Sequence, residues 1–186
     1  METSDLSHHI LSRYNAELEG IRSGVLQMGG LVEQQLQNGV KALAMGGDKG
    51  VHILDDAIHC SHSLATSLVL AKALEHLGFD LVLAGMSSTD AEMSVVPSMV
   101  AERLDINQAT FAGALSVDGS TVSITREGDT ATEQVSTGLP AVVSITDQTD
   151  EARYPAFRAI MMAKKKPVET LSLADIGVDP ASVGLA

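Results

Sequence analysis

Apolar positions along the chain follow two different periods. From Leu11 to Leu43 they recur at steps of three and four residues, which is the spacing of one long amphipathic helix. After Gly46-Gly47 short apolar runs alternate with stretches of helical spacing. The elements expected there are strands at Val51–Leu54 and Leu81–Ala84 and helices at Ser63–Leu77 and Met93–Leu104. This alternation predicts an α/β fold with a parallel sheet covered by helices.

Local signals refine these elements. Leu64, Leu68, Ala71 and Leu74 would share one side of their helix, and Gly78 is placed to end it. The continuous apolar run Leu81–Ala84 is typical of a strand covered on both faces.

The sequence becomes β-rich after Gln108. Asp118-Gly119 predicts a type I′ hairpin turn between Ala114–Val117 and Thr121–Thr125, and Gly128-Asp129 predicts a second turn. Pro140 precedes the apolar strand Ala141–Ile145. A short helix is expected within Tyr154–Lys166, and another in the tail.

Composition narrows the function classes. The 186 residues fit one domain with or without an appendage. Twelve Lys and Arg against 24 Asp and Glu give a net charge of −12, which disfavours binding to nucleic acid or anionic membranes. The single cysteine, Cys60, rules out an intrachain disulfide framework. Without an apolar run of about 18 residues or a signal peptide, we expect a cytoplasmic protein with no membrane span.

The loop Gly85–Glu92 is the most informative candidate for a binding site. It lies between an apolar strand and the next helix, where free backbone N–H groups and the positive helix end attract anions. Asp90 and Glu92 would repel phosphate, so they are expected to contact sugar hydroxyls or to cap the helix. An ordinary capped loop is the alternative.

Other clusters give weaker signals. His59-Cys60-Ser61-His62, near Asp55, resembles a metal cluster, but no second ligand pair follows at the spacing of a zinc site. A loop with local caps is therefore expected, and no metal. Glu127, which follows Arg126, could act as a general acid or base, or it could be an ordinary surface carboxylate beside an arginine. The sequence offers no catalytic centre, so we do not expect an enzyme.

The segment Arg153–Lys166 allows two interpretations. Phe157 stands between Arg153 and Arg158, close to Ile160, Met161 and three lysines, as in an exposed aromatic anchor for protein docking. Alternatively, Phe157, Ile160 and Met161 form the buried side of a short helix.

Several motifs, in order, resemble the β subunit of electron transfer flavoprotein. They are Ala42–His52, Leu83–Asp90, Arg153–Phe157, Ala163–Lys166 and Leu173–Val178, so the likeness runs from about residue 41 to 186. It implies an α/β domain of the adenine-nucleotide-binding kind with a β-hairpin region. It also implies pairing with an α subunit that holds most of the FAD, a structural AMP in the β subunit, and electron transfer from acyl-CoA-type or other flavin dehydrogenases.

The resemblance also assigns residues to roles. Gly85–Val96 matches the stretch that surrounds the AMP phosphate in the family. The cofactor-binding candidates are Gly85, Ser87, Ser88, Thr89, Asp90, Glu92, Met93 and Ser94. The segment 145–166 matches the loop that docks on dehydrogenases, with Phe157 at the anchor position. The partner-binding candidates are Arg153, Tyr154, Phe157, Ile160, Met161 and Lys165. Glu127 matches a glutamate that helps to hold the mobile flavin domain.

The first part of the chain departs from this family. Residues 6–36 resemble the N-terminal helix of the phosphate-signalling regulator PhoU, through His8-His9-Ile10, Tyr14–Glu19 and Met28–Leu36. We therefore predict an amphipathic helix over residues 1–40 fused to an α/β domain over 41–186 that is incomplete at both ends, with open sheet edges. The alternatives to an electron carrier are a helical regulatory module of the phosphate-signalling kind and a stand-alone nucleotide-binding module.

Overall fold

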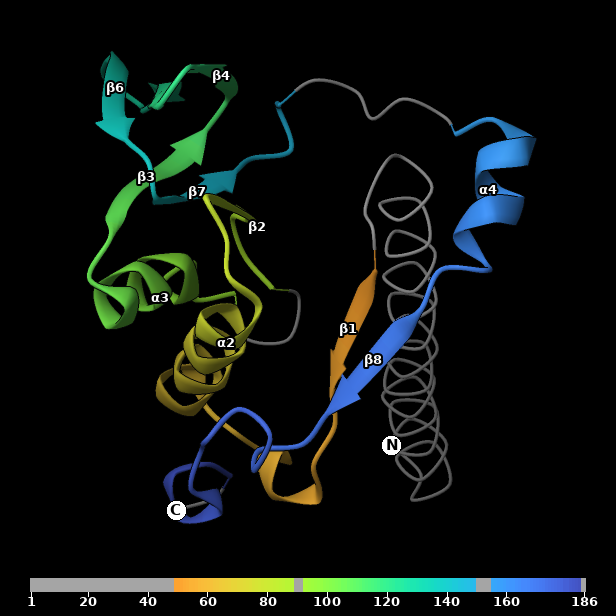
Figure 1. The fold of residues 1–186 in the computed structure, drawn as a ribbon. Coiled ribbons are helices and arrows are strands. Elements are labelled where there is room, and N and C mark those ends of the chain that lie inside the picture. Colours follow the sequence, from red (N-terminus) through yellow and green to blue (C-terminus); the bar gives the residue numbers. More distant parts are fainter. Residues whose placement is uncertain (1–48, 89–91, 150–154, 185–186) are drawn as a thin grey trace, which may run out of the picture. The chain divides into compact units, whose positions relative to one another are not determined.

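The computed structural model describes residues 49–88, 92–149 and 155–184. The long helix predicted within residues 1–40 lies outside this part of the chain. The chain divides into two compact units, Met1–Gly50 with Tyr154–Val168 and Val51–Arg153 with Glu169–Ala186. Figure 1 labels the helices and strands of both units.

The larger unit contains a three-stranded parallel sheet in the order β2-β7-β3. Its strands are β2 (Leu81–Gly85), β7 (Ala141–Ile145) and β3 (Asn107–Ala112). The central strand β7 is buried over Ala141–Ser144, as its continuous apolar run requires. The predicted α/β class with a parallel sheet is confirmed.

The edge strand β2 corrects one expectation. Its apolar run predicts cover on both faces, but the side chain of Leu83 is 56% exposed. The reason is that β2 pairs with β7 on one side only, and within the described residues its outer edge has no partner strand. Among the described strands, β2 is thus an edge strand, and the loss of neighbouring strands stays a prediction.

Strand β1 (Gly50–Ile53) does not join this sheet but pairs with β8 (Val168–Leu171), a strand that the sequence pattern did not reveal. Gly50 N donates to Pro167 O (3.0 Å) and Leu54 N donates to Leu171 O (2.9 Å). The two strands run in the same direction (Figure 1).

Helix α2 (Ser63–Leu77) begins and ends where the sequence predicts. The His62 side chain accepts a hydrogen bond from Leu64 N (3.2 Å), and Gly78 follows the last turn with a φ of +68°. On the predicted side, Ala71 is buried and Leu68 and Leu74 pack on buried clusters, but Leu64 is 56% exposed. Ala65, Ser67, Val69 and Ala73 are buried as well. These residues are buried because α2 packs against two neighbours, α3 and the C-terminal tail.

Helix α3 (Val96–Leu104) begins three residues later than predicted. Ser94 has a φ of +55°, which is incompatible with a right-handed helix. Pro97, in the first turn, has no N–H to donate and favours a helix start there. α3 packs through Val100 and Ala101 on Val142 of β7.

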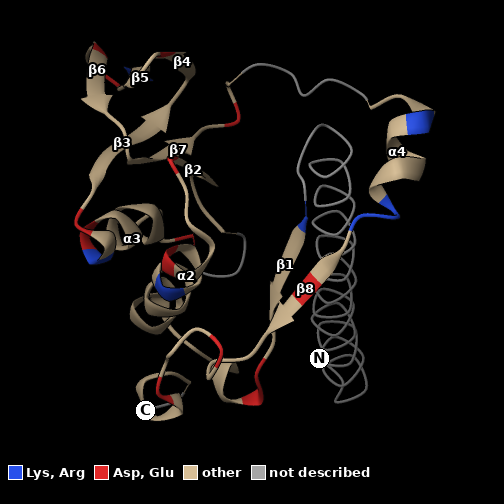
Figure 2. Ribbon diagram, viewed as in Figure 1, with Lys and Arg blue, Asp and Glu red and all other residues tan. Residues whose placement is uncertain are grey.

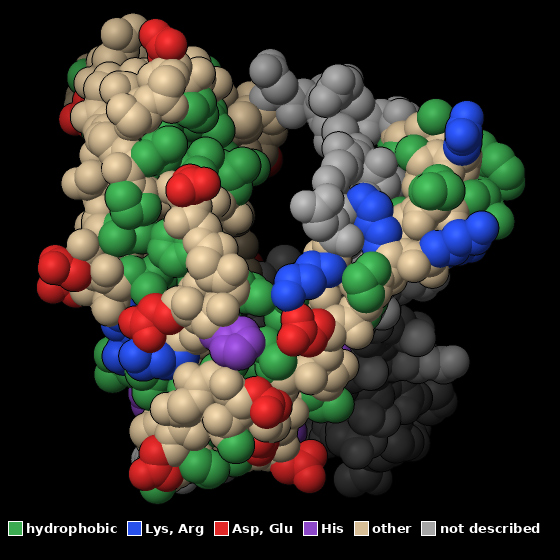
Figure 3. Space-filling view, viewed as in Figure 1, with side chains coloured by type: hydrophobic (Ala, Val, Ile, Leu, Met, Phe, Trp, Pro, Cys, Tyr) green, Lys and Arg blue, Asp and Glu red, His purple; other side chains and the backbone are tan. Residues whose placement is uncertain are grey.

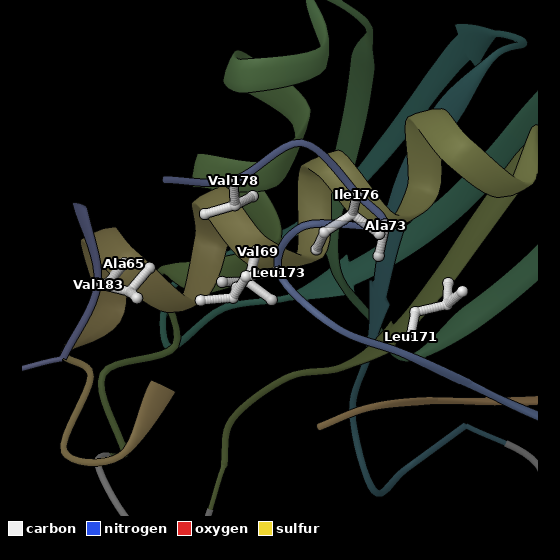
Figure 4. Close-up of a cluster of buried hydrophobic side chains, with 8 residues drawn as sticks. All are labelled: Ala65, Val69, Ala73, Leu171, Leu173, Ile176, Val178 and Val183. Atoms are coloured by element: carbon white, nitrogen blue, oxygen red, sulfur yellow. The ribbon is translucent and has the colours of Figure 1, made fainter. Parts of the chain in front are cut away.

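The C-terminal tail crosses α2 and forms a core with it (Figure 4). Leu171, Leu173, Ile176, Val178 and Val183 meet Ala65, Val69 and Ala73 of α2. The predicted helix in the tail is a short 3-10 turn, η2 (Pro180–Ser182), and another such turn, η1 (Asp56–Ile58), follows β1.

Hydrogen bonds hold the tail in place. Asp55 Oδ2 accepts from Leu173 N (3.3 Å), and Gly184 N donates to Ser61 Oγ (2.9 Å). The Ser172 hydroxyl and N–H both donate to Asp175 Oδ2 (2.7 Å each), and these bonds lower the pKa of the Asp175 carboxyl.

A separate antiparallel sheet contains β4 (Ala114–Asp118), β5 (Thr121–Glu127) and β6 (Thr132–Gly138). The predicted β4–β5 hairpin is confirmed, but its turn is not of type I′. Asp118 pairs with Thr121, so the turn residues are Gly119 and Ser120, and only Gly119 has a positive φ (+56°). That pattern belongs to a type II′ turn. The second turn is confirmed by the bond from Gly128 N to Ala131 O (3.0 Å).

The smaller unit contributes helix α4 (Phe157–Ala163), which confirms the predicted short helix. Among the described residues, no helix is both long enough and apolar enough to cross a membrane.

Candidate functional site

The candidate nucleotide loop leaves the parallel sheet at the carboxyl end of β2. Met86 N donates to Ile145 O (2.9 Å), so the loop starts tied to the end of β7. Gly85, Ser87 and Ser88 are exposed there, and a Cβ added to Gly85 would meet nothing within 4 Å. Open space with hydroxyl groups beside it lies where open α/β sheets bind ligands.

The other end of the loop has an unusual backbone. Glu92 and Ser94 both have positive φ values, +49° and +55°, and Val95 has right-handed helical angles. A left-handed residue followed by a right-handed one turns successive N–H groups toward one side, an arrangement that binds anions. Ser94 and Val95, directly before the start of α3 at Val96, show this succession of backbone angles. A phosphate site at this backbone stays a prediction.

Not every predicted loop residue joins this arrangement. Thr89 and Asp90 lie outside the described residues. The side chains of Glu92 and Met93 are exposed, and Glu92 N donates to Ser88 O (3.0 Å). The position of the loop was predictable from the sequence, but the predicted helix start at Met93 was three residues too early. The positive φ values of Glu92 and Ser94 could not be predicted from the sequence.

Helix α4 presents the predicted docking residues to solvent. Phe157 is 78% exposed, Met161 and Met162 are 44% and 56% exposed, and Ile160 is half-buried. Phe157 and Met161 are four residues apart and therefore share a face. Of the three residues that the alternative places on a buried side, Phe157, Ile160 and Met161, only Ile160 is partly buried. Arg153 and Tyr154 lie outside the described residues.

The surroundings of these apolar side chains are positively charged. Basic residues lie near both ends of α4 (Figure 2). These are Arg158 near its start and Lys164 and Lys165 after its end, and all three are exposed. Figure 3 shows green apolar and blue basic side chains side by side over α4. In a chain of net charge −12, this surface can attract an acidic partner and bury an aromatic side chain in it.

Glu127 is the exposed last residue of β5. Within the part of the chain that the structure describes, its side-chain carboxylate makes no hydrogen bond or ion pair. Its neighbour Arg126 is engaged elsewhere: Nε donates to Thr110 O (2.8 Å), and Nη1 lies 3.2 Å from Glu133 Oε2. Arg126 therefore ties β3 to β5 and leaves the Glu127 carboxylate available to a partner. The sequence did not reveal this role of Arg126.

The histidine cluster before α2 serves as local caps, as predicted. His62 caps α2, Asp55 Oδ1 accepts from Ala57 N (3.0 Å), and Cys60 Sγ lies 2.9 Å from His59 Nδ1 on the surface. Across residues 49–88, 92–149 and 155–184, no group of three or more His, Cys, Asp or Glu is arranged to hold a metal ion.

A comparison with protein families decides the ancestry of the chain. Residues 20–176 match the model of the electron transfer flavoprotein domain. The chain belongs to this family. The matched range contains both the loop after β2 and α4, so the resemblance to electron transfer flavoproteins is confirmed. It begins at residue 20, inside the range 6–36 that resembles PhoU; the division of the chain near residue 40 stays a prediction.

Curated relatives carry the same family name. The chain is 41% identical over 175 residues to the electron transfer flavoprotein subunit beta of Mycobacterium leprae, covering 94% of this chain and 66% of the relative. It is 40% identical to that of Mycobacterium tuberculosis, covering 90% and 64%, and 38% identical to that of Bos taurus, covering 76% and 56%. The chain thus spans less than two thirds of the length of these relatives.

Proposed function

We propose that this electron transfer flavoprotein-family chain is a carrier subunit without a catalytic centre of its own. It pairs with a flavoprotein α subunit and passes electrons from acyl-CoA-type or other flavin dehydrogenases through FAD. The observation that carries the proposal is the family match over residues 20–176, together with relatives named as β subunits.

The exposed surface of α4 supports the docking step. An aromatic side chain that is 78% exposed and rimmed by cations is costly to leave in water unless a partner covers it. In this proposal Phe157 enters an apolar pocket of the dehydrogenase, and Met161 adapts to the pocket wall. Lys165 and Arg158 face acidic side chains around the pocket.

The backbone between Ser94 and Val96 supports a structural AMP. Three N–H groups turned to one side would hold its phosphate, and the exposed Ser87 and Ser88 hydroxyls would contribute further hydrogen bonds. Glu92 would stay outside the phosphate site, because a carboxylate repels it. No metal is part of this proposal.

FAD, held mostly by the α subunit, supplies the electron-accepting chemistry when bound. The contribution of this chain is to position the flavin-bearing domain. The carboxylate of Glu127, which is exposed at the end of β5, is available for an ion pair with a basic side chain of the α subunit.

The division of the chain also belongs to the proposal, with an amphipathic helix over residues 1–40 that resembles PhoU and an α/β domain over 41–186. Two alternatives are a helical regulatory module of the phosphate-signalling kind and a stand-alone nucleotide-binding module. A chain with either of these functions would not co-purify with an α subunit and its flavin.

Co-expression with an electron transfer flavoprotein α subunit tests the proposal. The chain is pulled down through a tag, and the visible spectrum of the eluate is recorded. Flavin absorbance with both subunits present in equal amounts is the expected result. A colourless chain without the α subunit, although it is soluble and folded by circular dichroism, would contradict the proposal.

A further inference from the structure

The last turn of α3 is joined to α2 by a side chain that the proposed function does not yet use. Arg103 Nε donates to Ser67 Oγ (2.9 Å), and its Nη2 donates to Leu64 O (3.1 Å). Ser67 has no exposed surface, and its hydroxyl also donates to Leu64 O (2.9 Å). The buried Ser67 hydroxyl therefore both accepts and donates a hydrogen bond at this junction.

These bonds are directional contacts between the two helices. The buried residues of α3, Pro97, Val100 and Ala101, make apolar contacts, which have no preferred direction. The planar two-donor fork of an arginine is directional. Within the described residues, no other side-chain hydrogen bond joins α2 to α3.

The register of α3 matters because its other end borders the candidate phosphate site. α3 has nine residues, so a rigid helix of about 14 Å connects Arg103 to the N–H groups of Ser94–Val96. A rotation at one end moves the N–H groups at the other end out of their common direction. Their geometry thus depends on a contact far from any ligand.

We propose that Arg103 is a positioning residue for the phosphate of the bound nucleotide. It does not touch the nucleotide; by holding α3 on Ser67 it keeps the N–H groups of Ser94, Val95 and Val96 aligned. This inference rests on the proposed AMP site.

The test compares two ligands that differ only in the phosphate. AMP and adenosine are titrated calorimetrically into the full chain, in complex with its α subunit, for wild type, Arg103→Gln and Ser67→Ala. Arg103→Gln is expected to weaken AMP about tenfold, the scale of a lost hydrogen bond to a charged group. Adenosine affinity is expected to change less than about twofold, since adenosine lacks the phosphate.

Two further variants sharpen the result. Lys72→Gln removes the same charge from an exposed pair on α2 (Lys72 Nζ to Glu75 Oε2, 2.6 Å) and is expected to leave both affinities unchanged. Ser67→Ala keeps the arginine and its bond to Leu64 O but removes the acceptor of Nε, so it is expected to weaken AMP selectively too. The double variant should lose little more than Arg103→Gln alone, because the two residues act as one unit.

The outcomes separate the two proposals. If wild type binds AMP and the variants bind it equally well, or lose AMP and adenosine in parallel, the positioning role is overturned and the nucleotide site stands. If wild type binds neither ligand, the nucleotide site itself is overturned. Should Arg103→Gln fail to fold, the selectivity of Ser67→Ala decides the question.

Discussion

Removing the aromatic ring of Phe157 should weaken docking to a partner protein without changing the stability of the fold. The side chain is 78% exposed in the free chain. A phenylalanine buries roughly 200 Å² when fully covered, so about 150 Å² remains available to a partner. At about 25 cal/mol per Å² this corresponds to an upper limit near 4 kcal/mol, of which an alanine would retain about a third.

The variant Phe157→Ala is therefore expected to lose about 2–3 kcal/mol of docking free energy, or roughly 30- to 150-fold in Kd. Its unfolding free energy should stay within about 0.5 kcal/mol of wild type, because the ring has few contacts to lose. The dissociation constant is measured by calorimetry between the α-subunit complex and an acyl-CoA dehydrogenase, and stability by urea unfolding.

A matched control comes from another exposed apolar residue. Val117 on β4 is 49% exposed and lies in the other compact unit, so Val117→Ala should leave docking unchanged. A change of less than about threefold in Phe157→Ala, or an equal loss in Val117→Ala, would refute the anchor. A large loss of stability in Phe157→Ala would instead indicate that Phe157 stabilises the fold.

Three further predictions concern the C-terminal tail. Leu173 has no exposed surface, so Leu173→Ala should cost about 2–5 kcal/mol in urea unfolding, whereas Leu64→Ala, at a residue that is 56% exposed, should cost less than about 1. Gly184→Ala should destabilise by more than about 1 kcal/mol, because φ is +76° and the new Cβ would lie 2.7 Å from Ala57 O; unchanged unfolding would contradict this. The carboxylate of Asp175 has a lowered pKa, so its contribution is present at neutral pH and is lost as pH falls below about 4. Asp175→Asn should therefore be less stable than wild type at about pH 7 and nearly equal at about pH 2; a difference independent of pH would refute this.

Local sequence signals were sufficient to predict elements whose ends are fixed by capping or turn residues. Helix α2 begins at a capping side chain and ends at a left-handed glycine, both of which are readable from the chain. The β4–β5 hairpin was readable too, although the pairing of Asp118 with Thr121 moves its turn one residue along. Such features depend on neighbours within four residues.

Burial and site geometry depended on residues that are distant in the sequence. The run Leu81–Ala84 looks fully buried, but Leu83 is exposed because no strand pairs with the outer edge of β2 within the described residues. The partner of Arg103 is Ser67, 36 residues away on another helix. The left-handed backbone at Ser94 follows from the way the loop joins α3, and serine gives no sign of it.

The most direct test of the carrier role is electron transfer itself. The complex of this chain with an FAD-loaded α subunit is mixed with a catalytic amount of an acyl-CoA dehydrogenase and its acyl-CoA substrate, without oxygen, and the visible flavin absorbance is followed. The account predicts bleaching of the flavin in the complex, much slower bleaching with Phe157→Ala, and none with the α subunit alone. Flavin that stays oxidised in the complex, or that is reduced equally fast without this chain, would contradict the account.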